Sequence, residues 1–194
     1  MVILGLLACY LLGSIPFGYV VARAWNVDIR RHGSGNIGAT NVFRIVGVWP
    51  GVTVFILDFL KGTLAVWLGF MASSDPLVIL LFGFAAILGH MYSCFMKFKG
   101  GKGAATGLGV LAGIAPDIFI VVIIIAIILI SVTRYVSVAS IFTSFAVWLM
   151  MVVWQKPSAY IWVTFFIAVF ILFRHIPNVK RLLAGTEHRF GHRE

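Results

Sequence analysis

Two short polar segments of this chain combine glycine residues with side chains that bind anions. The first spans residues 31–44 and reads Arg-His-Gly-Ser-Gly-Asn-Ile-Gly-Ala-Thr-Asn-Val-Phe-Arg. Glycines allow successive backbone N–H groups to converge on an anion, and Ser34 adds a neutral hydrogen-bonding group. The guanidinium of Arg44 is a planar bidentate donor that suits phosphate. An ordinary polar turn with interfacial arginines has the same composition, so this first glycine loop leaves both interpretations open.

The second glycine loop spans residues 97–107 and reads Lys-Phe-Lys-Gly-Gly-Lys-Gly-Ala-Ala-Thr-Gly, directly before a predicted helix. A helix N-terminus offers N–H groups and a partial positive charge to an anion, and Lys102 would add a point charge there. It is not a Walker P-loop, because Lys102 is followed by Gly103 and the upstream glycine spacing is absent. A flexible basic hairpin is the alternative. We favour phosphate binding, because the loop leads into an unusually short apolar helix.

A third polar region follows the last apolar stretch. His175 and Asn178 stand just past its end, where a histidine can move protons near neutral pH. Glu187 is the one acidic residue among the basic ones of residues 174–190, so we expect it to be a structural partner. An amphipathic surface helix that anchors the tail through Lys180 and Arg181 is compatible with both roles.

Two charged residues, Asp58 and Lys61, lie three positions apart inside the second apolar stretch, on one helical face. Charges at that depth are costly and normally paired, so we expect a mutual structural pair. His90 and Tyr92, near the end of the third stretch, either line a site or are satisfied interior groups.

The composition indicates which elements position these groups. The 194 residues are 61% hydrophobic and 11% charged, whereas soluble domains carry about 25% charged residues. This predicts an all-α, polytopic membrane protein that forms one transmembrane domain over residues 1–194. The formal net charge of +9 is explained by membrane topology. Nucleic acid is a poor partner, because the basic residues are scattered over short loops.

The apolar stretches predict seven transmembrane helices, of which the fourth and fifth result from splitting one long run before Pro116 and Asp117. The fourth would be only about 17 Å long against a hydrocarbon core of about 30 Å, so we expect its start to be sunk within protein. The predicted spans are residues 2–25, 51–71, 76–98, 104–114, 117–132, 135–153 and 159–173.

Charge favours seven spans over six. With seven spans and the N-terminus outside, all of the 15 Lys and Arg residues except Lys61 and Lys156 fall on the cytoplasmic side. Six spans would place Arg134 and the basic C-terminus opposite the first loops. Both glycine loops then lie at the cytoplasmic face, which suggests chemistry on a phosphorylated molecule at the lipid boundary.

Several catalytic signatures are absent. No histidine has an aspartate five positions on, no Gly-x-Ser-x-Gly elbow occurs, and no Cys/His or carboxylate spacing suits a metal. We therefore expect no metal or cofactor, and a reaction that uses an already activated substrate in a positively charged site.

Three motifs resemble those of the bacterial acyl-phosphate:glycerol-3-phosphate acyltransferases, the PlsY family. Residues 33–41 resemble the first motif, residues 100–106 the second, and residues 174–178 with 187–190 the third. Residues 57–62 and 88–92 also resemble family segments, so the match covers the whole chain in order. A small departure is Ser93, where the family pattern would have proline.

The resemblance implies transfer of a fatty acyl group from acyl phosphate to the 1-hydroxyl of sn-glycerol 3-phosphate. The products would be lysophosphatidate and inorganic phosphate, in the first step of phospholipid synthesis at the bacterial inner membrane. It also implies seven spans, contact with membrane lipids, and no obligate protein partner.

The resemblance also assigns site residues. Ser34, Arg44 and Lys102 would bind phosphate, while His175 and Asn178 would lie at the reacting hydroxyl. Either His175 or the substrate's own phosphate would accept the proton, and both stay open. The remaining substrate-binding residues would be Gly33, Gly35, Asn36, Gly38, Thr40, Asn41, Gly100, Gly101, Gly103, Thr106 and Ser140, with Asp58, Lys61, Glu187 and Arg189 as structural support.

The physics of such a reaction is mainly electrostatic. Two phosphates near −2 charge and about 6 Å apart repel by roughly 10 kcal/mol at an effective dielectric of about 20. Positive side chains would offset that repulsion and hold the reactants in attack geometry. A phosphate transporter would instead need charged groups along a path through the membrane. A purely structural or lipid-binding bundle would leave the glycine loops unexplained.

Overall fold

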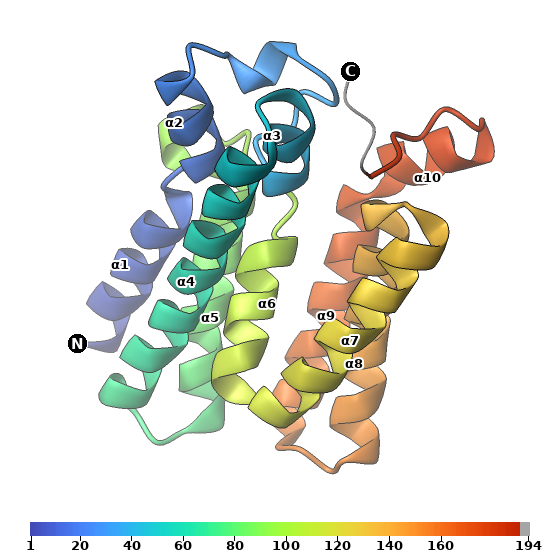
Figure 1. Cartoon of the computed structure of the whole chain (residues 1–194). Coiled ribbons are helices and arrows are strands. Elements are labelled where there is room, and N and C mark those ends of the chain that lie inside the picture. Colours follow the sequence, from blue (N-terminus) through green and yellow to red (C-terminus); the bar gives the residue numbers. More distant parts are fainter. Residues whose placement is uncertain (191–194) are drawn as a thin grey trace. The chain divides into compact units, whose positions relative to one another are not determined.

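The structure, a computed structural model, describes residues 1–190, and every regular element among them is helical (Figure 1). The chain divides into two compact units, and the boundary along the chain falls between Ile114 and Ala115. The elements of the first unit are α1 (Val2–Ser14), α2 (Phe17–Ala24), the short 3₁₀ helix η1 (Ile29–Arg31), α3 (Ala39–Ile45), α4 (Val48–Ala72), α5 (Pro76–Met91), the 3₁₀ helix η2 (Cys94–Met96) and α6 (Ala104–Ile114). The second unit has α7 (Pro116–Thr133), α8 (Val136–Val153), α9 (Ser158–Arg174) and α10 (Ile176–Leu183).

Among residues 1–190, five segments are long and apolar enough to cross a membrane, and the bent pair of α9 and α10 makes a sixth if it counts as one span. The protein is therefore an all-helical, multi-pass membrane protein. The five segments are Val2–Ala24, Val48–Ala72, Pro76–Met96, Pro116–Thr133 and Val136–Val153. The predicted split of the long apolar run is confirmed, because α6 ends at Ile114 and α7 begins at Pro116. With only 11 residues, α6 falls below the length of a span, so a seventh crossing stays a prediction.

The first apolar stretch, predicted as one helix, is broken between α1 and α2. Pro16 has no N–H to donate and disfavours helical geometry at Ile15, so α1 ends at Ser14. In lipid, a backbone carbonyl left without a donor costs several kcal/mol. Here, side chains of neighbouring elements supply the donors: Ser93 Oγ donates to the carbonyl of Ser14 at 2.5 Å, and Lys61 Nζ donates to that of Ile15 at 3.2 Å.

Small residues let α4 and α6 pack with their backbones in close contact. A Cβ added at Gly62 would stand 2.2 Å from the carbonyl oxygen of Thr106, and one at Gly109 would stand 1.9 Å from that of Phe59. Thr63 reinforces the contact by donating its hydroxyl to the Gly109 carbonyl at 3.0 Å. Such small-residue contacts are typical of membrane helix pairs. They fix the position of α6, and hence of the second glycine loop before it, against α4.

In the second unit, α8 packs against both α7 and α9. The turn between α8 and α9 is tied to the start of α7, because Lys156 pairs with Asp117 at 2.6 Å. The axis bends by 52° between α9 and α10, where Pro177 lies in the first turn of α10.

Candidate active site

The first glycine loop is organised around the buried side chain of Asn41. Its amide nitrogen lies within hydrogen-bond distance of the carbonyls of Ile29 (3.3 Å), His32 (3.1 Å) and Asn36 (2.9 Å). Its oxygen accepts from the backbone N–H of Ser34 at 3.1 Å. We predicted Asn41 to contact substrate, but its amide is committed to the loop backbone. The geometry therefore gives Asn41 a supporting position within the loop.

Two glycines give this loop its turns. Gly33 and Gly35 have φ values of +54° and +67°, which side chains with a Cβ rarely adopt. A Cβ at Gly33 would also stand 2.5 Å from Asn41 Oδ1. Ser34, between them, is exposed, and Arg44 lies half-buried on α3. The other predicted binding residues of this loop, Asn36, Gly38 and Thr40, are half-buried.

The start of the first glycine loop is held by Asp28, which caps η1. Its carboxylate accepts from Arg30 Nη2 at 2.7 Å and lies 3.4 Å from Arg23 Nη2 and 3.9 Å from Arg31 Nε. The hydrogen bonds from Arg30 hold the pKa of Asp28 well below its usual range. Asp28 therefore stays ionised at neutral pH, and one carboxylate is surrounded by three guanidinium groups.

The second glycine loop folds back onto the end of α5. The backbone N–H groups of Gly100 and Gly101 donate to the carbonyls of Met91 and His90, each at 3.0 Å. These two amides satisfy carbonyls at the end of α5, so Lys102 and the start of α6 carry the positive potential of this loop. Substrate binding by Gly100 and Gly101 stays a prediction. Gly103, with φ +84°, turns the chain into α6.

Thr106, also predicted to bind substrate, is fully buried in the first turns of α6. Its hydroxyl has no hydrogen-bond partner among the described residues, and its carbonyl lies against Gly62 of α4. In this structure Thr106 is therefore part of the contact between α4 and α6.

Beneath the loops lies a buried ionic cluster formed by Asp58, Lys61 and His90. Lys61 Nζ is 2.7 Å from Asp58 Oδ1, and His90 Nδ1 is 3.4 Å from the same oxygen. The exposed fraction of each side chain is 6% or less, which is very low for charged groups. The expected pairing of Asp58 with Lys61 is thus present, and His90 joins it.

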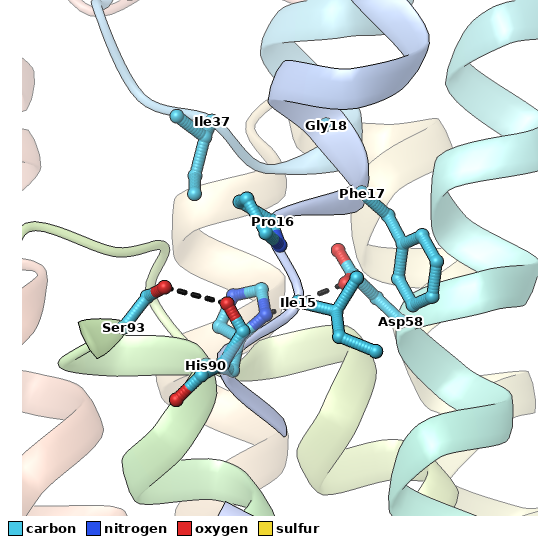
Figure 2. Close-up of a pocket in the computed structure, with 9 residues that line it drawn as sticks. Ile15, Pro16, Phe17, Gly18, Ile37, Asp58, His90 and Ser93 are labelled. Carbon is cyan, nitrogen blue, oxygen red and sulfur yellow. Dashed lines mark hydrogen bonds and ion pairs between the residues drawn. The ribbon is translucent and has the colours of Figure 1, made fainter. Parts of the chain in front are cut away.

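Figure 2 shows a small pocket over this cluster. It is lined by the helix break from Ser14 to Gly18, by Ile37 of the first glycine loop, and by Asp58, His90 and Ser93. The second glycine loop packs against the ring of His90, since a Cβ at Gly101 would stand 2.1 Å from His90 Nε2. The first glycine loop therefore lines this pocket through Ile37, and the second contacts His90, which also lines it. From its sequence, His90 was expected either to line a site or to be a satisfied interior group, and its contacts with Asp58 and Gly101 were not predicted. Pro16 inside an apolar stretch was a signal for the helix break.

In the second unit, Glu187 accepts hydrogen bonds from three side chains. Asn178 Nδ2 is 2.6 Å and Ser137 Oγ 3.0 Å from Oε1, while Arg181 Nε is 2.8 Å from Oε2. Burial alone raises the pKa of Glu187, but these hydrogen bonds outweigh it and hold the pKa below its usual value. Ionised Glu187 thus joins α8 to α10 and fixes the orientation of the Asn178 amide.

The segment that follows Glu187 also lies against the start of α8. Phe190 donates its backbone N–H to the carbonyl of Arg134 at 2.6 Å, and Arg189 Nε donates to the hydroxyl of Tyr135 at 3.4 Å. The role of Arg189 as structural support stays a prediction. The hydroxyl of Ser140, on α8, donates to the Val136 carbonyl of its own helix at 2.9 Å.

His175 lies at the bend between α9 and α10 and is buried. Its Nδ1 is 2.8 Å from the carbonyl oxygen of Ile171. Because a carbonyl only accepts, Nδ1 carries the proton, and the lone pair of a neutral ring lies on Nε2. The chain stays helical past Pro177, since Val179 donates its N–H to the His175 carbonyl at 2.9 Å. Ser34, Arg44 and Lys102 thus belong to the first unit, and His175, Asn178 and Ser140 to the second.

Comparison with known proteins places this architecture in one enzyme family. The family model described as glycerol-3-phosphate acyltransferase matches residues 3–185. The glycerol-3-phosphate acyltransferase of Carboxydothermus hydrogenoformans is 43% identical over 100% of this chain and 99% of its own.

Two solved structures share the fold as well as the sequence. A crystal structure of PlsY, an integral membrane glycerol 3-phosphate acyltransferase, in its glycerol 3-phosphate form is 42% identical, with a TM-score of 0.94 over 98% of this chain and 96% of that one. Its lysophosphatidic acid form is 41% identical, with a TM-score of 0.91 over 98% and 95% of the two chains. The chain belongs to the glycerol-3-phosphate acyltransferase family, and it is a multi-pass membrane enzyme of lipid biosynthesis.

Proposed function

We propose that this enzyme transfers a fatty acyl group from acyl phosphate to the 1-hydroxyl of sn-glycerol 3-phosphate, releasing lysophosphatidate and inorganic phosphate. The observation that carries the proposal is the convergence of two glycine loops, each with a cationic side chain, on one buried cluster. A reaction between two phosphorylated molecules needs two anion sites held at a fixed separation. The related structures named for glycerol 3-phosphate and lysophosphatidic acid forms support the acceptor and the product.

The proposed topology has seven crossings, with the N-terminus outside and both glycine loops at the cytoplasmic face of the bacterial inner membrane. The short helix α6 is the extra crossing, and its start lies below the membrane surface. The charge distribution supports this arrangement, because positive residues stay on the cytoplasmic side. In this proposal residues 1–194 act as one acyltransferase domain.

The chemistry needs little from a strong acid. In acyl phosphate the carbonyl carbon is bonded to a phosphate oxygen, and phosphate is a good leaving group. The hydroxyl oxygen of glycerol 3-phosphate attacks that carbon, the bond to phosphate oxygen breaks, and the hydroxyl proton leaves to a base. Arg44 and Lys102, with Ser34, offset the repulsion between the two phosphates. Since the amides of Gly100 and Gly101 are used by α5, these side chains and the α6 N-terminus supply the stabilisation.

Two groups are proposed at the reacting hydroxyl, His175 and Asn178. With Nδ1 of His175 on the Ile171 carbonyl, Nε2 is the ring atom that accepts a hydrogen bond from the hydroxyl. We favour an orienting role for His175, because glycerol 3-phosphate brings its own basic phosphate. Asn178 is held in one orientation by Glu187, so it is suited to fix the acceptor.

The direct test uses purified protein in lipid nanodiscs with palmitoyl phosphate and radiolabelled glycerol 3-phosphate. We expect lysophosphatidate and inorganic phosphate in equal amounts, and no product when palmitoyl-CoA replaces palmitoyl phosphate. Turnover with palmitoyl-CoA alone would refute the donor. Absence of product with acyl phosphate, acyl-CoA and acyl-carrier protein alike would refute the reaction.

A further inference from the structure

We propose that the buried ionic cluster of Asp58, Lys61 and His90 sets the separation of the two glycine loops, with His90 as a positioning residue for the second. The proposal rests on the function proposed above, in which each loop holds a phosphate. The cluster itself contacts no substrate in this proposal. It acts through backbone contacts on either side.

The connection to the second glycine loop runs through both the backbone and the ring of His90. The carbonyl of His90 accepts from the N–H of Gly101 at 3.0 Å, and the ring lies so close that a Cβ at Gly101 would stand 2.1 Å from Nε2. On its other side the ring is held by Asp58 Oδ1, 3.4 Å from Nδ1. A shift of the imidazole therefore moves Gly101, and Lys102 follows directly in the chain.

The connection to the first glycine loop runs through the break between α1 and α2. Lys61 Nζ donates to the carbonyl of Ile15 at 3.2 Å and lies 5.5 Å from the centre of the Phe17 ring. The next residue, Gly18, touches the first glycine loop directly, because a Cβ added there would stand 1.6 Å from the carbonyl oxygen of Ile37. In Figure 2, Ile37 lies at the upper edge of the pocket and His90 at its lower edge, while Asp58 reaches the pocket from α4.

Asp58 joins the two connections, because one of its oxygens lies next to both Lys61 and His90. Stability alone is a weak reason for such a cluster, since replacing a buried ion pair by apolar residues is often neutral or stabilising. Directional contacts, in contrast, fix positions to within a fraction of an ångström. A misplacement of about 1 Å can cost on the order of 10²-fold in rate, so this is the property a two-phosphate site requires.

The kinetic test compares variants that separate position from stability. His90→Ala removes both contacts of the ring, whereas His90→Asn keeps a donor toward Asp58 but loses the surface against Gly101. We expect kcat/KM to fall about 10- to 100-fold in both, mainly through a higher KM for the phosphorylated substrates. Asp58→Asn with Lys61→Met removes both charges together. We expect Asp58→Asn alone to lower the melting temperature and to raise KM. In the double variant we expect the melting temperature to be restored while KM stays raised.

A matched control is Thr164→Ala, which removes a buried hydroxyl that donates only within α9, to the Tyr160 and Ile161 carbonyls. Thr164→Ala is expected to lower the melting temperature without raising KM. Wild-type KM in the stably folded double variant would overturn the proposal, as would an equal rise in KM in Thr164→Ala.

A second measurement does not depend on catalysis. Spin labels at Arg31→Cys and Lys99→Cys, both exposed residues of the first unit, report the separation of the loops in a background without Cys9 and Cys94. We expect one narrow distance distribution for this background, and a broader or displaced one after His90→Ala or the double substitution. An unchanged distribution would overturn the proposal. A changed distribution in a protein that acylates no glycerol 3-phosphate would refute the proposed function and leave the positioning role intact.

Discussion

The carboxylate of Glu187 accepts a hydrogen bond of 2.6 Å from the side-chain amide of Asn178, across the turn that follows α10. The same carboxylate accepts from Ser137 and Arg181, so three donors converge on one ionised group. Because all three are donors, a side chain that presents an NH₂ group there would face at least one of them. The orientation of Asn178 therefore depends on the charge of Glu187 as well as on its shape.

We predict that Glu187→Gln lowers both stability and activity. Hydrogen bonds to charged groups contribute about 1.5–3 kcal/mol each to stability, so loss of one or two should lower the free energy of unfolding by about 2–4 kcal/mol. Thermal unfolding in detergent and kcat in nanodiscs measure the two effects. Arg189→Gln, which alters only the contact with Tyr135, is the matched control and should cost much less. Equal effects of the two substitutions would show that Glu187 has no special position.

The lowered pKa of Glu187 predicts a pH dependence of stability. A carboxyl whose folded pKa lies below its unfolded value of about 4.3 contributes stability that is fully present above that unfolded value. The contribution is lost as the pH falls through the folded pKa, where protonation removes the charge and turns one carboxylate oxygen into a donor that faces another donor. Melting temperature measured from pH 7 downward should therefore decline in the wild type and decline less in Glu187→Gln. Parallel curves would contradict this role.

Arg44→Ala and Lys102→Ala should each lower kcat/KM by about 10²–10³-fold while the protein stays folded. Removing one electrostatic group from a preorganised site costs about that much, because no water replaces it in the same geometry. Lys97→Ala is the control for the second glycine loop, since Lys97 is an exposed lysine of the same loop. Steady-state kinetics with palmitoyl phosphate check the effect. Near wild-type kinetics in Arg44→Ala or Lys102→Ala would assign that side chain to topology alone.

The proposed topology predicts that Ser73 and Thr186 are labelled from opposite sides of the membrane. Ser73, just past α4, should react with a membrane-impermeant thiol reagent from outside when replaced by cysteine. Thr186, beyond α10, should react only after the membrane is opened. The measurement uses intact cells and a background without Cys9 and Cys94. Labelling of both positions from one side would contradict seven crossings.

The sequence predicted the helical class and most helix positions, because long apolar runs have few alternatives to a transmembrane helix. The break at Pro116 was also predicted, since proline and aspartate interrupt that run together. The break at Pro16 was not, because no charged residue accompanies that proline. Only Lys61 and Ser93, distant in sequence, make the freed carbonyls tolerable.

The assignment of site residues stays a prediction, and the structure shows how two of them are placed in their loops. Asn41 and Gly101 were both expected to face substrate. In the structure the amide of Asn41 serves the loop backbone, and the N–H of Gly101 serves the end of α5. Composition indicates that a polar group is present, but only the packed chain decides whether its hydrogen bond goes to the protein's own backbone or to a substrate. The contact of His90 with Gly101 depends on such packing and has no signature in sequence spacing.

The last prediction concerns His175, whose Nδ1 is held by the Ile171 carbonyl at 2.8 Å. This contact fixes the ring and places the lone pair of a neutral imidazole on Nε2, as both a base and an orienting group require. If His175 is the general base, His175→Ala and His175→Gln should both lower kcat by roughly 10²–10⁴-fold and abolish the acid limb of the pH–rate profile. If His175 orients the hydroxyl while the phosphate of glycerol 3-phosphate accepts the proton, His175→Gln should retain much of the activity with the same profile. We expect the second result, because the acceptor carries a basic phosphate and the reaction has a good leaving group. The measurement is kcat against pH for both variants, with binding of glycerol 3-phosphate determined separately. Loss of the acid limb in His175→Gln, with binding unchanged, would establish His175 as the base instead.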